Sequence, residues 1–229
     1  MSSSMNESLL DHYPSHLNNL LSEYLIKSNS QLSQDIFALC ESGGKGNGYF
    51  VEFGAGDGIY LSNSLLLEKE FGWTGILAEP NRWLFEHLSN NRPNAALESS
   101  CVWTCSEESL EFNATTDSYF STLNSFTDSD NHSETRASGQ KYSVKTISLF
   151  DLLQKHKAPS VIDFLSIDTE GSEFEILNSF DFAKYQFKVI ACEHNFTSNR
   201  DRIFQLLTRN GYRRVHEIFS KHDDWYVLQ

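Results

Sequence analysis

With 229 residues, the chain suits one α/β domain with a sizeable core and is too short for two ordinary domains joined by a linker. Its formal net charge of -13 argues against a nucleic-acid partner, because a surface that follows a phosphate backbone needs clustered Lys and Arg. No segment has the run of about eighteen apolar residues that a membrane span requires, and residues 1–7 lack the basic-then-apolar layout of a signal peptide, so we expect a soluble, cytoplasmic protein.

Two helices are predicted ahead of the first strand. Apolar side chains recur at helical spacing over residues 17–25 and again over residues 32–39. We expect residues 1–44 to form a helical segment that covers one end of a sheet, and residues 45–229 to form the main domain.

Residues 49–58 predict a buried strand that contains Glu52 and opens into a loop with three alternating glycines, Gly54, Gly56 and Gly58. Glycine is needed where the backbone takes positive φ or where a ligand must come closer than a Cβ allows. The loop therefore predicts a cofactor site.

The charge of this loop distinguishes between two classes of cofactor. Dinucleotide sites use G-x-G-x-x-G, whose amides face a pyrophosphate, but here the third glycine comes one residue early and Ile59 stands where that pattern has glycine. Glu52 and Asp57 would repel a pyrophosphate, whereas they would attract the sulfonium and α-ammonium groups of S-adenosylmethionine. We therefore expect S-adenosylmethionine rather than a nicotinamide dinucleotide.

The next two elements agree with this cofactor. Residues 59–71 have a helical apolar pattern that Gly72 can end, and residues 75–78 predict a second buried strand that ends in Glu79. Glu79 lies about twenty residues beyond the last glycine, where the strand-end acid of a βαβ unit meets the ribose hydroxyls of an adenosine.

Beyond Glu79 the pattern is less regular. A helix is predicted around residues 83–88, a third strand over residues 94–102 and an edge hairpin near residues 110–112. Residues 113–140 are rich in Ser, Thr, Asn and Asp, and such an insertion in a compact domain is either a functional lid or a mobile loop.

The remainder of the chain returns to alternating strands and helices. Strands are predicted over residues 161–167 and 187–192, and the chain ends in two strands, 213–219 and 225–228, joined by a short turn that makes the last strand antiparallel. Seven strands in a mostly parallel sheet, with the last one reversed in a C-terminal hairpin, is the layout of the Rossmann-like class I methyltransferase fold.

Polar residues that follow the predicted strands mark the chemical site. Ligands of an open α/β sheet bind outside the carboxyl ends of its strands. The residues expected to converge there are Glu52, Glu79, Asp168, Glu170, Glu193 and His194.

Methyl transfer to a hydroxyl needs a base, and Asp168 or His194 can fill this role, with Glu193 completing the acceptor side. Closely packed acids also suggest a divalent cation, for which Asp168, Glu170 and Glu193 are the candidate ligands. Alternatively, Asp168 and Glu170 only cap the following helix, and His194 is a core histidine bonded to a neighbouring carbonyl.

Several stretches carry a resemblance to a known family. They are Ser33-Gln34-Asp35-Ile36-Phe37, Tyr49 to Gly58, Leu61-Ser62-Asn63-Ser64, Gly72-Trp73-Thr74-Gly75, Glu79-Pro80-Asn81 and Ile167-Asp168-Thr169-Glu170-Gly171-Ser172-Glu173. Through these stretches the chain, from Gln34 onward, resembles the FkbM family of methyltransferases. The resemblance implies a Rossmann-like S-adenosylmethionine fold and methylation of hydroxyl oxygens on sugars and polyketides.

The expected function is therefore S-adenosylmethionine-dependent O-methylation of a small hydroxylated acceptor, such as a sugar or glycan unit, with a polyketide-like hydroxyl or a peptide as alternative acceptors. A catalytically silent binding or scaffold protein that keeps the fold is the alternative function. The residues expected at the cofactor are Glu52, Gly54, Ala55, Gly56, Asp57, Gly58, Ser62, Asn63, Glu79, Pro80, Asn81, Cys101, Val102 and Asp168.

Overall fold

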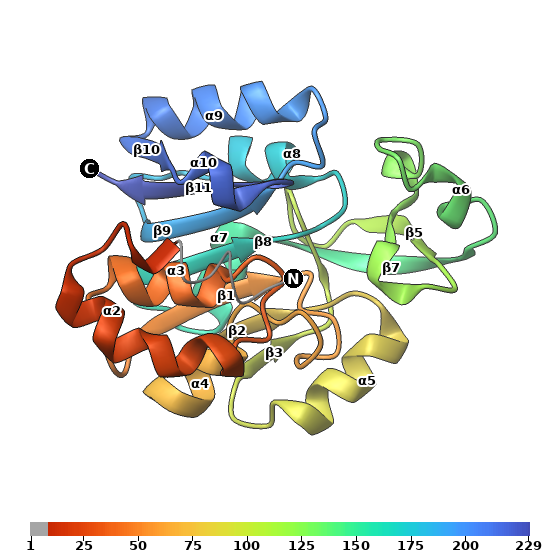
Figure 1. Ribbon diagram of the computed structural model, residues 1–229. Helices are drawn as coiled ribbons and strands as arrows, with labels where there is room; N and C mark the ends of the chain where they lie inside the picture. Colours follow the sequence, from red (N-terminus) through yellow and green to blue (C-terminus); the bar gives the residue numbers. More distant parts are fainter. Residues whose placement is uncertain (1–8) are drawn as a thin grey trace.

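The computed structural model describes residues 9–229 (Figure 1). In this range the main sheet has seven strands, in the spatial order β10 (Tyr212–Val215), β11 (Asp223–Leu228), β9 (Gln186–Glu193), β8 (Val161–Ile167), β1 (Tyr49–Phe53), β2 (Thr74–Ala78) and β3 (Ala96–Glu98). The strands from β9 to β3 are parallel, and β11 is antiparallel to both of its neighbours. The predicted α/β fold with a reversed last strand is confirmed.

Two layers of helices enclose the sheet (Figure 1). One layer consists of α2 (Ser15–Leu21), the 3₁₀ helix η1 (Ser22–Lys27), α3 (Gln34–Glu41), α4 (Leu65–Phe71) and α5 (Arg82–Asn91). The other consists of α7 (Leu149–Lys155), α8 (Glu173–Asn178) and α9 (Asn199–Arg209). Because successive strand residues point to opposite faces, Phe50 packs in the first layer and Val51 in the second. The central strands are therefore apolar on both faces.

The predicted N-terminal segment is described only in part. Residues 1–8, which include the stretch assessed for a signal peptide, lie outside the described residues. Helices α2 and α3 pack on the sheet through the buried side chains of Leu21, Ile36 and Phe37. Within residues 9–229 no helix is long and apolar enough to cross a bilayer.

The predicted helix over residues 59–71 is wrong in its first half, since α4 begins only at Leu65. Leu61 has a positive φ of 56°, which interrupts a helix. Residues 62–64 direct backbone and side-chain donors to the carboxylate of Glu52. These tertiary hydrogen bonds keep the segment as a loop around the first strand, despite its helical apolar spacing.

The predicted third strand over residues 94–102 is two strands in two different sheets. β3 belongs to the main sheet, whereas β4 (Cys101–Trp103) pairs in parallel with β7 (Gln140–Ser148). The chain therefore leaves the main sheet between β3 and β4 and begins a second, smaller sheet.

The predicted strand over residues 213–219 is too long. β10 ends at Val215, and a short helix, α10 (Glu217–Ser220), leads to β11. His216 has a φ of 55°, so the backbone turns out of the extended conformation at that residue.

The polar insertion over residues 113–140 is folded. Its strands belong to a four-stranded sheet within the described residues, in the order β4, β7, β5 (Ser109–Ala114) and β6 (Thr122–Leu123), and it also contains η2 (Ser118–Phe120), η3 (Asn124–Phe126) and α6 (Ser133–Arg136). Figure 1 shows this unit in green at one side of the molecule. Strand β7 is missing from the sequence-based expectation because polar residues dominate it, although buried Val144 helps to form a small core with Phe112 and Leu123.

Candidate active site

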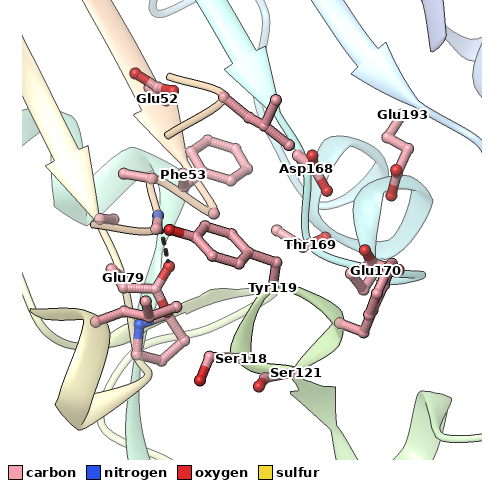
Figure 2. A pocket seen from close by; sticks show the side chains of 18 of the residues that line it. Glu52, Phe53, Glu79, Ser118, Tyr119, Ser121, Asp168, Thr169, Glu170 and Glu193 are labelled. Atoms are coloured by element: carbon pink, nitrogen blue, oxygen red, sulfur yellow. Dashed lines mark hydrogen bonds between the residues drawn. The ribbon is translucent and has the colours of Figure 1, made fainter. Parts of the chain in front are cut away.

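A cavity of about 450 Å³ lies at the carboxyl ends of β1, β2, β8 and β9, and residues of the insertion cover it. Figure 2 shows Glu79 on one side, Asp168 and Glu193 on the other, and Tyr119 reaching between them. The residues expected at the cofactor that line this cavity are Glu52, Gly54, Ala55, Gly56, Asn63, Glu79, Pro80, Cys101, Val102 and Asp168. Asp57, Gly58, Ser62 and Asn81 lie outside the lining.

Glu52 organises the loop between β1 and α4. Its Oε1 accepts a hydrogen bond from the amide of Asn63 at 2.8 Å, and its Oε2 accepts from the hydroxyls of Ser62, at 3.3 Å, and Ser64. Burial raises the pKa of Glu52, while nearby Arg92 and the hydroxyl donors oppose that rise. The carboxylate therefore shapes the backbone around the cofactor loop as well as lining the cavity.

Arg92 is fully buried behind this loop. Its guanidinium donates to the carbonyl of Gly58 at 3.0 Å, to the hydroxyls of Ser62 and Ser64 at 3.2 and 3.1 Å, and to Glu68 at 2.7 Å. No sequence signal points to Arg92, because it is an isolated arginine at the end of α5 and only packing brings it to the glycine loop.

Gly54 marks a close contact between two strand ends. Its φ is 76°, and a Cβ there would lie 1.6 Å from the carbonyl oxygen of Asp168. Any other residue would have to push the end of β8 away. The glycine that the sequence assigns to a ligand therefore also allows β1 and β8 to meet.

Tyr119, from η2, lies over the glycine loop. Its ring is 2.8 Å from the position that a Cβ would take at Gly56, and it meets Tyr60 edge to face with 5.1 Å between ring centroids. Burial, and to a lesser extent the negative charge of nearby Asp57, raises the pKa of Tyr119 to about 12. Asp57 accepts hydrogen bonds from two amides of the loop. The insertion thus forms part of the cavity wall above the cofactor loop.

Glu79 is buried at the end of β2. Its two carboxylate oxygens accept hydrogen bonds from the amide of Gly56 at 2.9 Å and the amide of Asn81 at 2.8 Å, and Figure 2 marks the first of these. Burial raises the pKa of Glu79 to about 7, although the two amides oppose the rise. Apolar parts of Pro80, Leu84, Cys101 and Val102 line the cavity beyond it.

The acidic group, which consists of Asp168, Glu170 and Glu193, lies across the cavity from Glu79. One carboxylate oxygen from each residue lies within 4.8 Å of those of the other two. Burial raises the pKa of Asp168 to about 7 and that of Glu170 to about 9, and it raises the pKa of Glu193 well above its usual range. The side chain of Glu193 opposes the rise in the pKa of Asp168.

Arg136 ties the insertion to the acidic group. Its guanidinium, fully buried, lies 2.6 Å from an oxygen of Glu170 and also binds both carboxylate oxygens of Asp130 at 2.8 and 3.0 Å. The hydroxyl of Thr122 donates to the carbonyl of Glu170 at 3.0 Å. The sequence gives no signal for this contact, which joins segments 34 residues apart.

The backbone amides at the start of α8 hydrogen bond to an acid other than the two that the sequence suggests as caps. Glu173 accepts hydrogen bonds from the amides of Thr169 and Gly171, each at 3.0 Å. Neither Asp168 nor Glu170 accepts a hydrogen bond from these amides among the described residues, and both line the cavity, where Glu170 also binds Arg136.

His194 does not line the cavity. One ring nitrogen accepts from the amide of Phe196 at 2.9 Å, and the other bonds the carbonyl of Asp223 at 3.0 Å. Adjacent residues of a strand point to opposite faces, so Glu193 faces the cavity and His194 faces away. The alternative of a core histidine bonded to a carbonyl describes this geometry.

Other polar residues also line the cavity. Gln31, Asn195 and His222 belong to its lining, and the imidazole of His222 bonds the side-chain oxygen of Gln31 at 2.7 Å. Gln31 comes from the N-terminal segment, which therefore contributes to the site besides covering the sheet.

Comparison with known proteins gives a family match. The family described as the methyltransferase FkbM domain matches residues 52–214, which include the glycine loop, Glu79 and the acidic group. No curated protein sequence matched significantly.

Among solved structures, the METTL16 methyltransferase domain is 12% identical with a TM-score of 0.48, and the alignment covers 86% of this chain and 66% of that one. The chain thus spans just under two thirds of the METTL16 structure. Precorrin-6y C5,15-methyltransferase from Geobacter metallireducens GS-15 is 11% identical with a TM-score of 0.43, covering 84% and 85% of the two chains. A TehB-like SAM-dependent methyltransferase from Corynebacterium glutamicum is 9% identical with a TM-score of 0.43, covering 94% and 100%.

The family match spans most of the chain and includes most of the residues that line the cavity. The protein belongs to the FkbM family of S-adenosylmethionine-dependent methyltransferases.

Proposed function

We propose that the protein transfers the methyl group of S-adenosylmethionine to a hydroxyl oxygen of a small neutral acceptor, such as a sugar or glycan unit. The observation that carries this proposal is a single cavity with two different halves. The glycine loop and Glu79 build one half, and the acidic group builds the other (Figure 2). Family membership supports the cofactor and the transfer of a methyl group.

In the cofactor half, Glu79 would accept hydrogen bonds from the ribose hydroxyls, and Pro80, Cys101 and Val102 would offer an apolar surface to the adenine. Residues 54–56 would hold the methionyl part. The carboxylate of Asp168, next to this loop, offers negative charge to the sulfonium of the cofactor.

The charge of the acceptor half favours a neutral molecule. The lining residues, all of them in the described part of the chain, include no Lys or Arg. A phosphate or carboxylate on the acceptor would face the acidic group, and no Lys or Arg of the lining would pair with it. The amide groups of Gln31 and Asn195 and the imidazole of His222 instead suit the hydroxyls of a sugar.

The acceptor hydroxyl must lose its proton as its oxygen attacks the methyl carbon and the bond from that carbon to sulfur breaks. We assign the proton to the carboxylate of Asp168, which lines the cavity beside the glycine loop. A positioned base contributes about 10²- to 10⁴-fold to such a step. His194 has no part in it, because both of its ring nitrogens bond to the backbone.

Calorimetry with S-adenosylhomocysteine and with NAD⁺ tests the cofactor, and release of S-adenosylhomocysteine in the presence of neutral sugars, glycans and nucleotide sugars tests the acceptor. We expect binding of S-adenosylhomocysteine alone and turnover with neutral acceptors. Binding of NAD⁺ alone would overturn the cofactor assignment. Binding without turnover on any hydroxylated acceptor would favour the scaffold alternative, and methylation only at nitrogen or carbon would overturn the oxygen assignment.

Glu79→Gln is expected to weaken the binding of S-adenosylhomocysteine about ten- to a hundredfold at pH 8, since a charged hydrogen-bond acceptor is lost. The pKa of Glu79 in the free protein is raised to about 7. Ribose hydroxyls donate to the ionised form, so binding favours loss of the proton, and the affinity of the unaltered protein should increase as the pH rises towards 7 and level off above it. Calorimetry across this range measures the effect.

The matched control for this prediction is Glu86→Gln. Glu86 is an exposed acid on α5, outside the cavity lining, so the substitution changes the net charge equally without touching the site. Its pH curve should follow that of the unaltered protein. If Glu79→Gln keeps the full pH dependence, another group titrates and Glu79 does not hold the ribose.

A further inference from the structure

The acidic group brings three carboxyl groups close together at one side of the cavity. Asp168 lies directly after β8 and Glu193 ends β9, so neighbouring parallel strands deliver both carboxylates to the same edge of the sheet. Glu170 joins them from the loop after β8, where its φ of 60° turns the backbone. One oxygen from each of the three residues lies within 4.8 Å of the others.

Arg136 is the cation that pairs with this group in residues 9–229, and of the three acids it contacts only Glu170, at 2.6 Å. The same guanidinium is bound by both oxygens of Asp130, which takes up much of its charge. Asp168 and Glu193 therefore have no cationic partner among the described residues. Three carboxylates in a largely buried site need a counter-charge or bound protons.

An unpartnered atom shows where a ligand would be accommodated. Oε2 of Glu193 is buried and has no hydrogen-bond partner among the described residues, and the side chain is 7% exposed. Figure 2 shows this carboxylate pointing from the end of β9 towards Asp168 and Glu170. A buried carboxylate oxygen without a donor is costly, and a cation between the three side chains would satisfy it.

We propose that Asp168, Glu170 and Glu193 bind a divalent cation of the Mg²⁺ or Mn²⁺ type, each through one carboxylate oxygen. Such hard cations prefer oxygen ligands at about 2.0 to 2.2 Å, so the ligand oxygens around one cation lie about 3 to 4.5 Å from one another. The oxygens of this group, all within 4.8 Å of one another, are near enough to share a cation. Water and the acceptor hydroxyl take the remaining coordination positions.

This role rests on the proposed function for the identity of the acceptor. Coordination lowers the pKa of the acceptor hydroxyl and fixes its oxygen, while the other oxygen of Asp168 remains free to receive the proton. A divalent cation supplies two positive charges to the three carboxylates, whereas an ammonium group on the acceptor would supply only one.

A neighbouring set of ligands fits less well. Oxygen and nitrogen atoms of Asp130, His132 and Glu170 also lie within 4.8 Å of one another. However, Asp130 already binds Arg136 with both oxygens, and the ring of His132 stacks on Phe120 with 4.2 Å between centroids. These groups are occupied, so the acidic group is the better cation site.

Titration of the full-length, metal-free protein with Mn²⁺, followed by calorimetry and by the loss of the free-ion electron paramagnetic resonance signal, tests the proposal. We expect one Mn²⁺ per chain with a dissociation constant below about 1 mM. Glu193→Gln should weaken Mn²⁺ binding at least about tenfold and leave the affinity for S-adenosylhomocysteine unchanged, which also shows that the variant is folded. Asp168→Asn, as a second variant, should weaken Mn²⁺ binding in the same way.

Glu79→Gln is the matched control, because it removes a buried acid from the other half of the same cavity. It should weaken S-adenosylhomocysteine binding and leave Mn²⁺ binding unchanged. No Mn²⁺ binding by the unaltered protein, or equal binding by all three variants, would overturn the cation site. The proposed function would survive that result if S-adenosylhomocysteine still binds and turnover persists after chelation, so the two failures are distinguishable.

Discussion

Asp168→Asn is expected to lower turnover at least about a hundredfold while leaving the affinity for S-adenosylhomocysteine nearly unchanged. The substitution keeps the size of the side chain but removes the charge that faces the acceptor oxygen in the proposed reaction. Steady-state rates of S-adenosylhomocysteine release, with calorimetric binding measured in parallel, separate the two quantities. A purely structural role predicts the opposite balance, a lower melting temperature with activity per folded molecule retained.

Asp163→Asn provides a control on the same strand. Asp163 lies near the opposite end of β8, where it binds Lys45 at 2.8 Å, Lys188 at 2.9 Å and the amide of Tyr49 at 2.9 Å. Loss of these bonds should lower the melting temperature without reducing turnover per folded molecule. Equal losses of turnover in the two variants would indicate that β8 is simply sensitive to substitution and that Asp168 has no special part in the reaction.

Gly54→Ala is expected to abolish cofactor binding and to destabilise the fold by more than about 3 kcal/mol. The methyl group would lie 1.6 Å from the carbonyl oxygen of Asp168, and φ is 76°. The end of β8 cannot retreat freely, because the amide of Asp168 donates to the carbonyl of Phe53 at 3.1 Å. Relief of the clash must therefore separate the strand ends on which both halves of the cavity depend.

Gly43→Ala isolates the backbone contribution to this effect. Gly43 has a similar φ of 68°, but a Cβ there meets no atom within 4 Å. This variant should lose only about 1 to 2 kcal/mol, the cost of the left-handed conformation, and should bind S-adenosylhomocysteine normally. Thermal unfolding and calorimetry measure both variants. Similar results for the two would mean that the contact between β1 and β8 tolerates a methyl group.

The cofactor half of the cavity could be predicted from the sequence because its signals are local. An apolar run, closely spaced glycines and an acid after the next strand each depend on neighbouring residues, and the structure brings Gly54, Gly56 and Glu79 to the same cavity. The start of α4 could not be predicted in this way. Its apolar spacing favours a helix from residue 59, but the carboxylate of Glu52 binds residues 62–64 and keeps them as a loop.

The acceptor half depends on contacts between distant segments. Glu193 and His194 are neighbours in the sequence, yet one lines the cavity and the other bonds to the carbonyl of Asp223. Which of the two faces the cavity depends on the register of β9 against β8, and a one-residue shift would exchange them. No sequence pattern marks Arg136, because its partner Glu170 lies in another element. The guanidinium and the carboxylate pair only when folding buries both of them.

The sequence by itself determined the order of strands and helices, the glycine loop and the acids at the strand ends, since hydrophobic periodicity and turn chemistry act over a few residues. Only the tertiary structure decided that the polar insertion folds over the cavity, that Arg92 and Arg136 are buried beside it, and that Asp168, Glu170 and Glu193 meet. These arrangements follow from strand register and from the burial of charge against a specific partner, and neither is encoded in the spacing of residues along the chain.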